Sequence, residues 1–278
     1  MPRPRILLAI VVCAGASAPA AAPYLSGSPP SVSVRATGPG APVEGPVLAL
    51  ALLPGDRLAV LARDAVRVYR FRGGEVGRLS ERPLPEPEPV RFPGGLLAAT
   101  EDAVWVERSG LRQALLLAVD EAGAIVERGQ AEAFPWPGCP RGLRYRDGTN
   151  LLEGTVEGLG DGPFLAVAAG VGVDQEGRVR LATPEGPRPS GLRAGPALVS
   201  LGGGLFAAAS ASAPGPADTI LIFERDGDEL RLLQEVEAPG AVRALATAPG
   251  ERAARLVAAV ESGEHVTIVP FQVGPPTP

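Results

Sequence analysis

Four glycines recur along this chain at intervals of about 50 residues, each in a polar turn between two apolar, β-prone runs. They are Gly73, Gly123, Gly177 and Gly227. The surroundings of the first and last glycine also correspond position by position, with Val68-Tyr69 matching Ile222-Phe223. A recurrence of this length indicates a repeat architecture in which each repeat is one supersecondary unit.

Each repeat has the composition of several short strands. In the first one, strand-length apolar runs are separated by turns rich in Gly, Asp and Arg: residues 47–53, 57–62, 66–71 and 76–81. Four strands in about 45–50 residues are typical of one blade of a β-propeller. Small or apolar pairs open five such units, just before Leu48, Arg91, Arg144, Leu198 and Arg243. The sequence therefore predicts five four-stranded blades.

The last unit contains only three strand runs before the chain ends, at residues 242–247, 255–260 and 266–272. A short stretch of alternating apolar and polar residues at 32–35 is predicted to supply the fourth strand. Its pairing would remove two exposed sheet edges at once. We therefore predict an all-β propeller over residues 47–273, closed by the N-terminal strand 32–35 and followed by a tail, 274–278. A pair of β-sandwiches is the alternative fold, but it gives no reason for a 50-residue recurrence.

The N-terminus has the features of an export signal. Arg3 and Arg5 precede an apolar stretch at residues 6–16 that is too short to span a bilayer as a helix, and Ala18-Pro19-Ala20 fits a cleavage site. We predict a signal peptide over residues 1–20, then a Pro/Gly/Ala-rich segment over 21–46, and a periplasmic or extracellular protein without stable membrane insertion after cleavage. An uncleaved anchor, or lipid attached at Cys13, is the alternative.

Composition excludes several kinds of function. The net charge is −5 and the arginines are dispersed, so nucleic-acid binding is disfavoured. His265 is the single histidine, and signal cleavage leaves Cys139 as the single cysteine, too few for a zinc site. Cys139 lies in a proline-rich stretch and is either a free thiol or paired with a partner.

On this pattern, residues 47–273 resemble bacterial exported β-propeller repeat proteins of the FG-GAP/VCBS-like or quinoprotein-like class. The resemblance implies the propeller architecture and no family-specific residues, because the characteristic motifs of those repeats are missing. Only Asp226-Gly227-Asp228 comes near the Asp-rich calcium loop of FG-GAP repeats, and an Asp-Gly hairpin turn explains it without a metal. No cofactor is expected, with calcium near Asp226 and Asp228 as the alternative.

The unit starts suggest a ligand site. The first strand of each propeller blade lines the central channel, so Arg91, Arg144 and Arg243 are predicted to converge there and bind an anion. Residues 134–162 are the least strand-like stretch, and their Trp136 and Tyr145 are predicted to belong to a recognition loop.

The leading interpretation is a non-enzymatic binding module for a protein, a glycan or a small anionic ligand. The alternative is a channel-centred carboxylate hydrolase, glycosidase or lactonase-like, which would need converging acids. Its candidate acids lie in loops or at strand ends: Asp56, Asp102, Asp147, Asp161 and Asp174. A structural subunit of an envelope assembly is a third possibility, and it would expose a large apolar patch.

Overall fold

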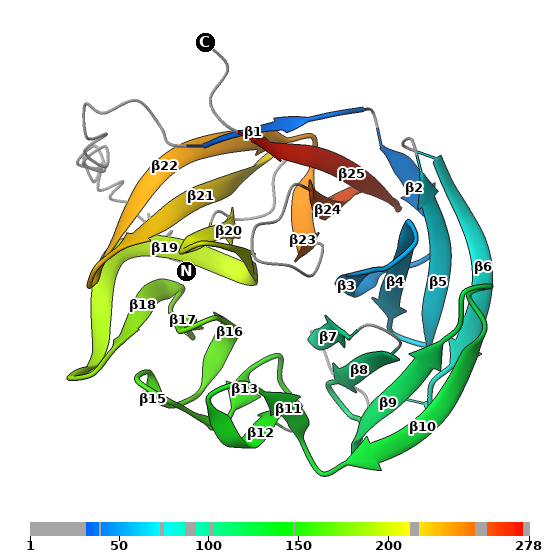
Figure 1. The fold of residues 1–278 in the computed structure, drawn as a ribbon, viewed down its shortest axis with the longest axis horizontal. Helices are drawn as coiled ribbons and strands as arrows, with labels where there is room; N and C mark the ends of the chain where they lie inside the picture. Colours follow the sequence, from blue (N-terminus) through cyan, green and yellow to red (C-terminus); the bar gives the residue numbers. More distant parts are fainter. Residues whose placement is uncertain are drawn as a thin grey trace, which may run out of the picture.

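The computed structural model describes residues 32–38, 40–72, 75–86, 93–100, 103–146, 148–211, 217–247 and 255–274. These residues form β-strands joined by turns and contain no helix, and hence none long and apolar enough to cross a membrane. The sheets stand around a central space like the segments of a ring (Figure 1). The predicted signal peptide lies outside the described residues.

The first two sheets are four-stranded antiparallel meanders. One runs in the order β3-β4-β5-β6 and the other in the order β7-β8-β9-β10. Their bounds are β3 Val47–Leu53, β4 Arg57–Ala62, β5 Ala65–Arg72, β6 Glu75–Pro83, β7 Gly95–Ala99, β8 Ala103–Arg108, β9 Ala114–Val119 and β10 Ile125–Ala131. The strand runs predicted between residues 47 and 81 are therefore confirmed.

The next sheet has ten strands, and seven of them form two four-stranded groups that share one long strand. The first half of β19 (Gly186–Gly202) pairs with β18, and its second half pairs with β20. The groups comprise β16 Phe164–Ala168, β17 Val171–Asp174 and β18 Arg178–Thr183 on one side, and β20 Leu205–Ser210, β21 Asp218–Asp226 and β22 Glu229–Ala238 on the other.

Several short strands precede these two groups. They are β11 Phe134–Trp136, β12 Cys139–Tyr145 and β13 Leu152–Glu153, which extend the ten-stranded sheet, and the separate pair β14 Thr155–Val156 and β15 Gly160–Asp161. Buried side chains of β12, β13, β14 and β16 share an apolar cluster of their own. We call residues 132–163 the insert.

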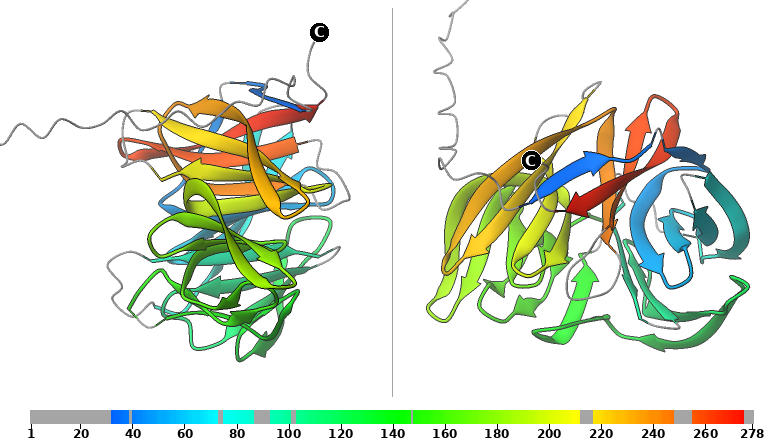
Figure 2. Two further views of the ribbon diagram at one scale, coloured as in Figure 1. Left: turned by 90° about the vertical axis from the view of Figure 1, so that its left-hand side faces the viewer. Right: turned by 45° about the horizontal axis from the view of Figure 1, so that its top comes forward.

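The last sheet joins the two ends of the described chain. Strands β23 (Ala241–Thr247), β24 (Arg255–Ser262) and β25 (His265–Gly274) are followed by β1 (Ser33–Ala36), with Ser33 opposite Gly274. Figure 2 shows β1 lying alongside β25. A further strand, β2 (Ala41–Val43), pairs with the other end of β25. The predicted strand at residues 32–35 is therefore present, shifted by one residue.

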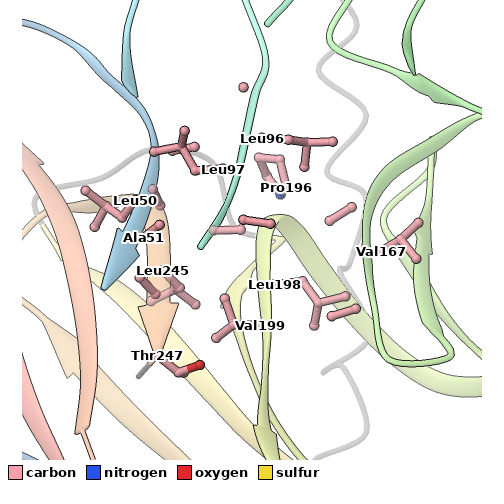
Figure 3. Close-up of a pocket in the computed structure, with 18 of the residues that line it drawn as sticks. Leu50, Ala51, Leu96, Leu97, Val167, Pro196, Leu198, Val199, Leu245 and Thr247 are labelled. Atoms are coloured by element: carbon pink, nitrogen blue, oxygen red, sulfur yellow. The ribbon is translucent and has the colours of Figure 1, made fainter. Parts of the chain in front are cut away.

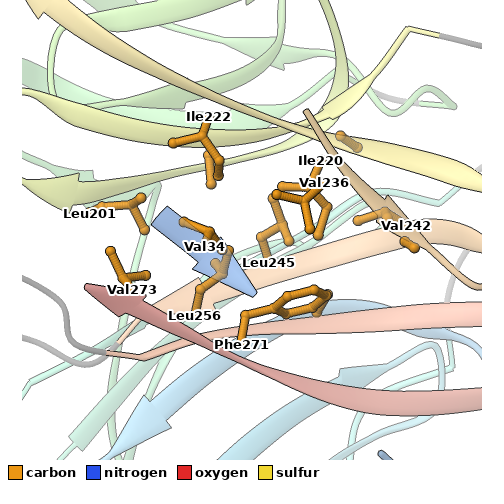
Figure 4. Close-up of a cluster of buried hydrophobic side chains, with 14 of the residues drawn as sticks. Val34, Leu201, Ile220, Ile222, Val236, Val242, Leu245, Leu256, Phe271 and Val273 are labelled. Carbon is orange, nitrogen blue, oxygen red and sulfur yellow. The ribbon is translucent and has the colours of Figure 1, made fainter. Parts of the chain in front are cut away.

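The core of the protein lies between neighbouring sheets. One cluster packs β3–β5 against β23–β25, another packs β3–β5 against β8 and β9, and a third packs the β16–β18 group against β20 and β21. In the cluster of Figure 4, Val34 from β1 lies among Ile222, Leu256 and Phe271, which come from two different sheets. The N-terminal strand thus contributes apolar contacts as well as backbone pairing.

The third repeat differs from the sequence prediction. Gly123 and Gly227 lie in turns between the third and fourth strands of their four-stranded groups, whereas Gly177 lies between β17 and β18, one turn earlier in its group. The predicted third unit start at Arg144 falls in β12, and the four-stranded group begins instead at β16. The cause is the insert, which moves the start of the third four-stranded group toward the C-terminus. Its length nevertheless leaves Gly177 about 50 residues from Gly123 and from Gly227. Gly73 lies outside the described residues.

Candidate functional site: the central pocket

The innermost strands of the sheets surround a central pocket with a volume of about 300 Å³. Its wall is formed by β3, β7, β16, β19 and β23, with additional side chains from the insert. Figure 3 shows Leu50, Leu97, Val167, Val199 and Leu245 around this space, one from each of the five strands. The prediction that first strands line a central channel therefore agrees with the positions of these strands.

β-Bulges mark the start of several lining strands. The register shifts between Val47 and Ala49 in β3, and between Val242 and Ala244 in β23, so that Leu48 and Arg243 are the extra residues. Leu165 in β16 is a third such residue. A bulge redirects the side chain of its extra residue out of the regular alternation.

All three bulged residues line the pocket. The position equivalent to Leu48 and Arg243 is therefore Leu165 in the third four-stranded group, and Arg144 does not hold it. In β19 the register shifts between Ala194 and Leu198, and Pro196 within this irregular stretch lines the pocket as well.

The pocket wall is largely apolar. Among the described lining residues, Arg243 is the only charged one, and the other polar side chains are Trp136, Tyr145, Ser200 and Thr247. An apolar wall with a few polar groups is typical of small-molecule sites, and a volume near 300 Å³ lies at the lower end of their range, about 300–1,000 Å³.

Arg243 lies where the central pocket meets a second hollow. This neighbouring hollow, of about 340 Å³, is also lined by Arg243 and Pro196, and its other residues include Glu176, Arg193 and Asp218. The Arg243 side chain is 41% exposed, and its Nε donates a hydrogen bond to Oε2 of Glu261. Its Nη1 and Nη2 have no hydrogen-bond partner among the described residues.

The acidic groups of the second hollow are already engaged within the protein. Asp218 accepts hydrogen bonds from Ser210 Oγ (2.7 Å), from its neighbour's backbone N–H and from Val242 N (3.0 Å). Glu176 accepts from Gln175 (2.9 Å) and forms an ion pair with Arg178 (3.1 Å). Arg243 therefore has more unused hydrogen-bonding capacity toward the hollow than these carboxylates.

The insert brings Trp136 and Tyr145 to the central pocket. The Tyr145 ring packs against Gly94, where a Cβ would lie 2.7 Å from Cζ. Ser109 fixes the same region, because its buried hydroxyl accepts from Gly94 N (2.9 Å) and donates to Thr149 O (2.8 Å). Both residues of the predicted recognition loop thus line the pocket.

A buried carboxyl group lies behind this part of the wall. Glu107 is 2% exposed, lies opposite Leu96 in the β7–β8 pair, and has an Oε2 without a hydrogen-bond partner among the described residues. Burial raises the pKa of Glu107 to about 7, against the opposing effects of the Arg144 charge and the Tyr145 backbone N–H. Burial, with Glu107 nearby, also raises the pKa of Tyr145.

The sequence analysis did not identify Glu107. It follows the apolar run at residues 103–106 in strand β8, and its position there was the available signal. Its side chain does not line the central pocket, so it is not placed to contact a ligand there.

The predicted arginines do not all meet at the pocket. Arg243 lines it, but Arg144 is exposed on β12, where Nη2 contacts Arg112 O at 3.4 Å, and it is absent from the described lining. Arg91 lies outside the described residues.

The candidate acids of the hydrolase alternative are also dispersed. Asp56 pairs with Arg255 (3.1 Å), Asp161 accepts from Thr155 (2.6 Å), and Asp174 pairs with Arg180 (2.8 Å). Asp102 and Asp147 lie outside the described residues. None of the three described acids lines the central pocket.

The possible metal and thiol sites are explained by local structure. Asp226 and Asp228 flank Gly227 in the β21–β22 hairpin, and Arg225 Nε donates to Gly227 O (2.9 Å). In the described part of the chain, no group of three or more His, Cys, Asp or Glu side chains is placed to hold a metal ion. The Cys139 thiol is buried and unpaired, and it donates to Gly142 O (2.9 Å).

Solved structures of other proteins share this arrangement of sheets. The PQQ-bound form of aldose sugar dehydrogenase from Streptomyces coelicolor matches with a TM-score of 0.58 at 14% identity, over 89% of this chain and 100% of that one. A putative oxidoreductase (glucose dehydrogenase) from a Thermus species matches with a TM-score of 0.50 at 15% identity, over 87% and 100%. Both belong to the β-propeller class.

The chain has the β-propeller fold. This propeller is not assigned to a family, since no protein-family model matches it and no curated protein sequence is significantly similar to it. At these identities the structural likeness establishes the fold alone.

Proposed function

We propose that this protein is an exported, non-enzymatic binding propeller that takes a small, largely apolar ligand into its central pocket. The observation that carries the proposal is the pocket itself, in which apolar side chains from five inner strands surround about 300 Å³. The finer architecture belongs to the same proposal: five four-stranded blades, with the ring closed by β1.

The hydrolase alternative has less support. A glycosidase-like mechanism needs two carboxyl groups separated by about 5–9.5 Å around the substrate. The described lining of the pocket contains no carboxylate, and Glu107 is buried behind the wall. A protein or glycan partner is compatible with the proposal, but the apolar wall favours a ligand with an apolar body.

Titration of the folded protein with 1-octanol, a neutral apolar probe, tests the proposal. Isothermal titration calorimetry should show saturable binding at one site with a negative heat-capacity change, the mark of apolar burial. Val199→Trp should abolish binding, because Val199 is half-buried and points into the pocket (Figure 3) and an indole would fill it.

The matched control is Val126→Trp, the same substitution at a 62% exposed position on β10. It should bind 1-octanol as the unmodified protein does, and urea denaturation should show that both variants are folded. The proposal is wrong if the unmodified protein does not bind 1-octanol, or if Val199→Trp binds it equally well.

A further inference from the structure

Arg243 places a positive charge on one side of the otherwise largely apolar central pocket. The apolar wall formed by Leu50, Leu97, Leu198 and Leu245 lies on one side of it, and the polar second hollow lies on the other. Arg243 lines both hollows and so stands at the boundary that they share.

The position of Arg243 follows from the fold rather than from chance exposure. Its equivalents at the β-bulges of two other inner strands are Leu48 and Leu165, both apolar. The β-bulge therefore presents a hydrophobic side chain to the pocket at two of the described positions and a positively charged side chain at the third. This asymmetry defines one side of the pocket as the place for a charged group.

The hydrogen-bonding state of Arg243 fits an incoming anion. A guanidinium has five N–H donors, and here only Nε has a partner among the described residues, the Glu261 carboxylate. Glu261 fixes the side chain, while Nη1 and Nη2 remain available to form a two-point contact with a carboxylate.

The charges around this position limit the ligand further. Glu261, Glu176 and Asp218 lie near Arg243 or line the adjoining hollow with it, and Arg193 is the other cation there. Three acidic and two basic side chains leave this region with an excess of negative charge. It would therefore repel a doubly charged group such as a phosphate monoester more than a single carboxylate. Since the acids already have internal partners, a cationic ligand gains less from them than a carboxylate gains from Arg243.

We infer that the ligand of the central pocket is an amphipathic monocarboxylate, with its apolar body in the pocket and its carboxylate on Arg243. This inference rests on the proposed function, because it names the ligand class of the same pocket. It assigns Arg243 as the residue that determines head-group specificity.

Three linear probes with eight carbon atoms each and different head groups test the inference: octanoate, 1-octanol and octylamine, at pH 8 and low salt. Octanoate should bind the full-length protein about tenfold or more tightly than 1-octanol, as expected for charge-assisted hydrogen bonds. Arg243→Gln should remove that advantage and leave the affinity for 1-octanol within about twofold.

The matched control is Arg188→Gln, which removes an arginine 53% exposed on the outer part of β19. It should leave all three affinities unchanged. Equal affinity for octanoate and 1-octanol, tighter binding of octylamine, or an octanoate preference that survives Arg243→Gln would overturn the inference while pocket binding stands. If 1-octanol does not bind at all, the proposed function fails first.

Discussion

The ring of Tyr145 occupies the space that a side chain on Gly94 would need. A Cβ atom at position 94 would lie 2.7 Å from Cζ and 3.0 Å from the hydroxyl oxygen of Tyr145. The contact joins the start of β7 to β12 of the insert, and so sets where Tyr145 meets the pocket wall.

Gly94→Ala is expected to destabilise the protein by about 1–3 kcal/mol, because the rigid aromatic ring must move to relieve the overlap. It should also weaken 1-octanol binding through the displaced Tyr145. Urea denaturation and calorimetry measure the two effects. Gly77→Ala is the control, since its Cβ would meet nothing within 4 Å, and it should change stability by no more than about 0.5 kcal/mol. Equal stability of the two variants would show that Tyr145 does not depend on Gly94.

The second prediction concerns the pH dependence of stability through Glu107. Burial raises its pKa to about 7 in the folded protein, above the value of about 4.3 in an unfolded chain. The folded state therefore holds the proton more tightly, and this group's contribution to stability falls as pH rises from about 4.3 to about 7, then stays constant.

Glu107→Gln mimics the neutral acid and should remove the fall in stability that Glu107 causes as pH rises. The variant should be similar in stability to the unmodified protein at pH 4 and more stable than it at pH 8, by up to about 3 kcal/mol. Urea denaturation across this pH range provides the measurement, with Glu121→Gln at an exposed turn as the control. A stability difference that does not change with pH would contradict the assignment.

The third prediction concerns strand β1, which pairs with β25. The side-chain amide of Gln234 on β22 accepts from Val34 N (2.8 Å) and donates to Val34 O (2.9 Å), so it satisfies both backbone groups of a residue in β1. Gln234→Ala should cost about 1–3 kcal/mol in unfolding free energy, because part-buried backbone groups lose their partners. Thermal and urea unfolding measure it, and Gln130→Ala on the exposed β10 is the control. If the two variants are equally stable, this link does not contribute to stability.

The fourth prediction concerns Cys139. Burial raises the pKa of its thiol, and the side chain is 5% exposed, so little reactive thiolate is presented to solvent. In a Cys13→Ser background, labelling by a maleimide at pH 8 should be at least about tenfold slower for the folded protein than for the same protein in urea. Equally fast labelling in both states would place Cys139 on the surface.

The sequence predicted the strands and the β-propeller class because those depend on local patterns. The runs at 47–53 and 57–62 alternate with turn residues in a way that leaves few other structures possible, and the short stretch at 32–35 complements a unit short of one strand. The position of Arg243 was also predictable, since it occupies the same place in its repeat as Leu48.

The third repeat could not be predicted in this way. The insert contains short strands of its own, and its length kept Gly177 in step with the other glycines although it lies in a different turn. Periodicity alone does not distinguish a repeat from an insertion of matching length, so Arg144 was assigned a position that Leu165 holds. The apolar character of the pocket was missed for a related reason: which residues of an inner strand face the centre depends on bulges that a sequence does not mark.

The pairing of β1 with β25 also affects how the protein folds. Ser33 and Gly274 lie at opposite ends of the described chain, so the contact between them has nearly the largest sequence separation available. Contacts of this kind form slowly, because bringing together residues far apart in the sequence has a large entropy cost before the contacts stabilise anything. The β1–β25 pairing must therefore await the last strand, and until β1 docks, the edge of β25 is open to pairing with another chain. Concentration during refolding should accordingly decide between closed monomers and strand-exchanged or aggregated species.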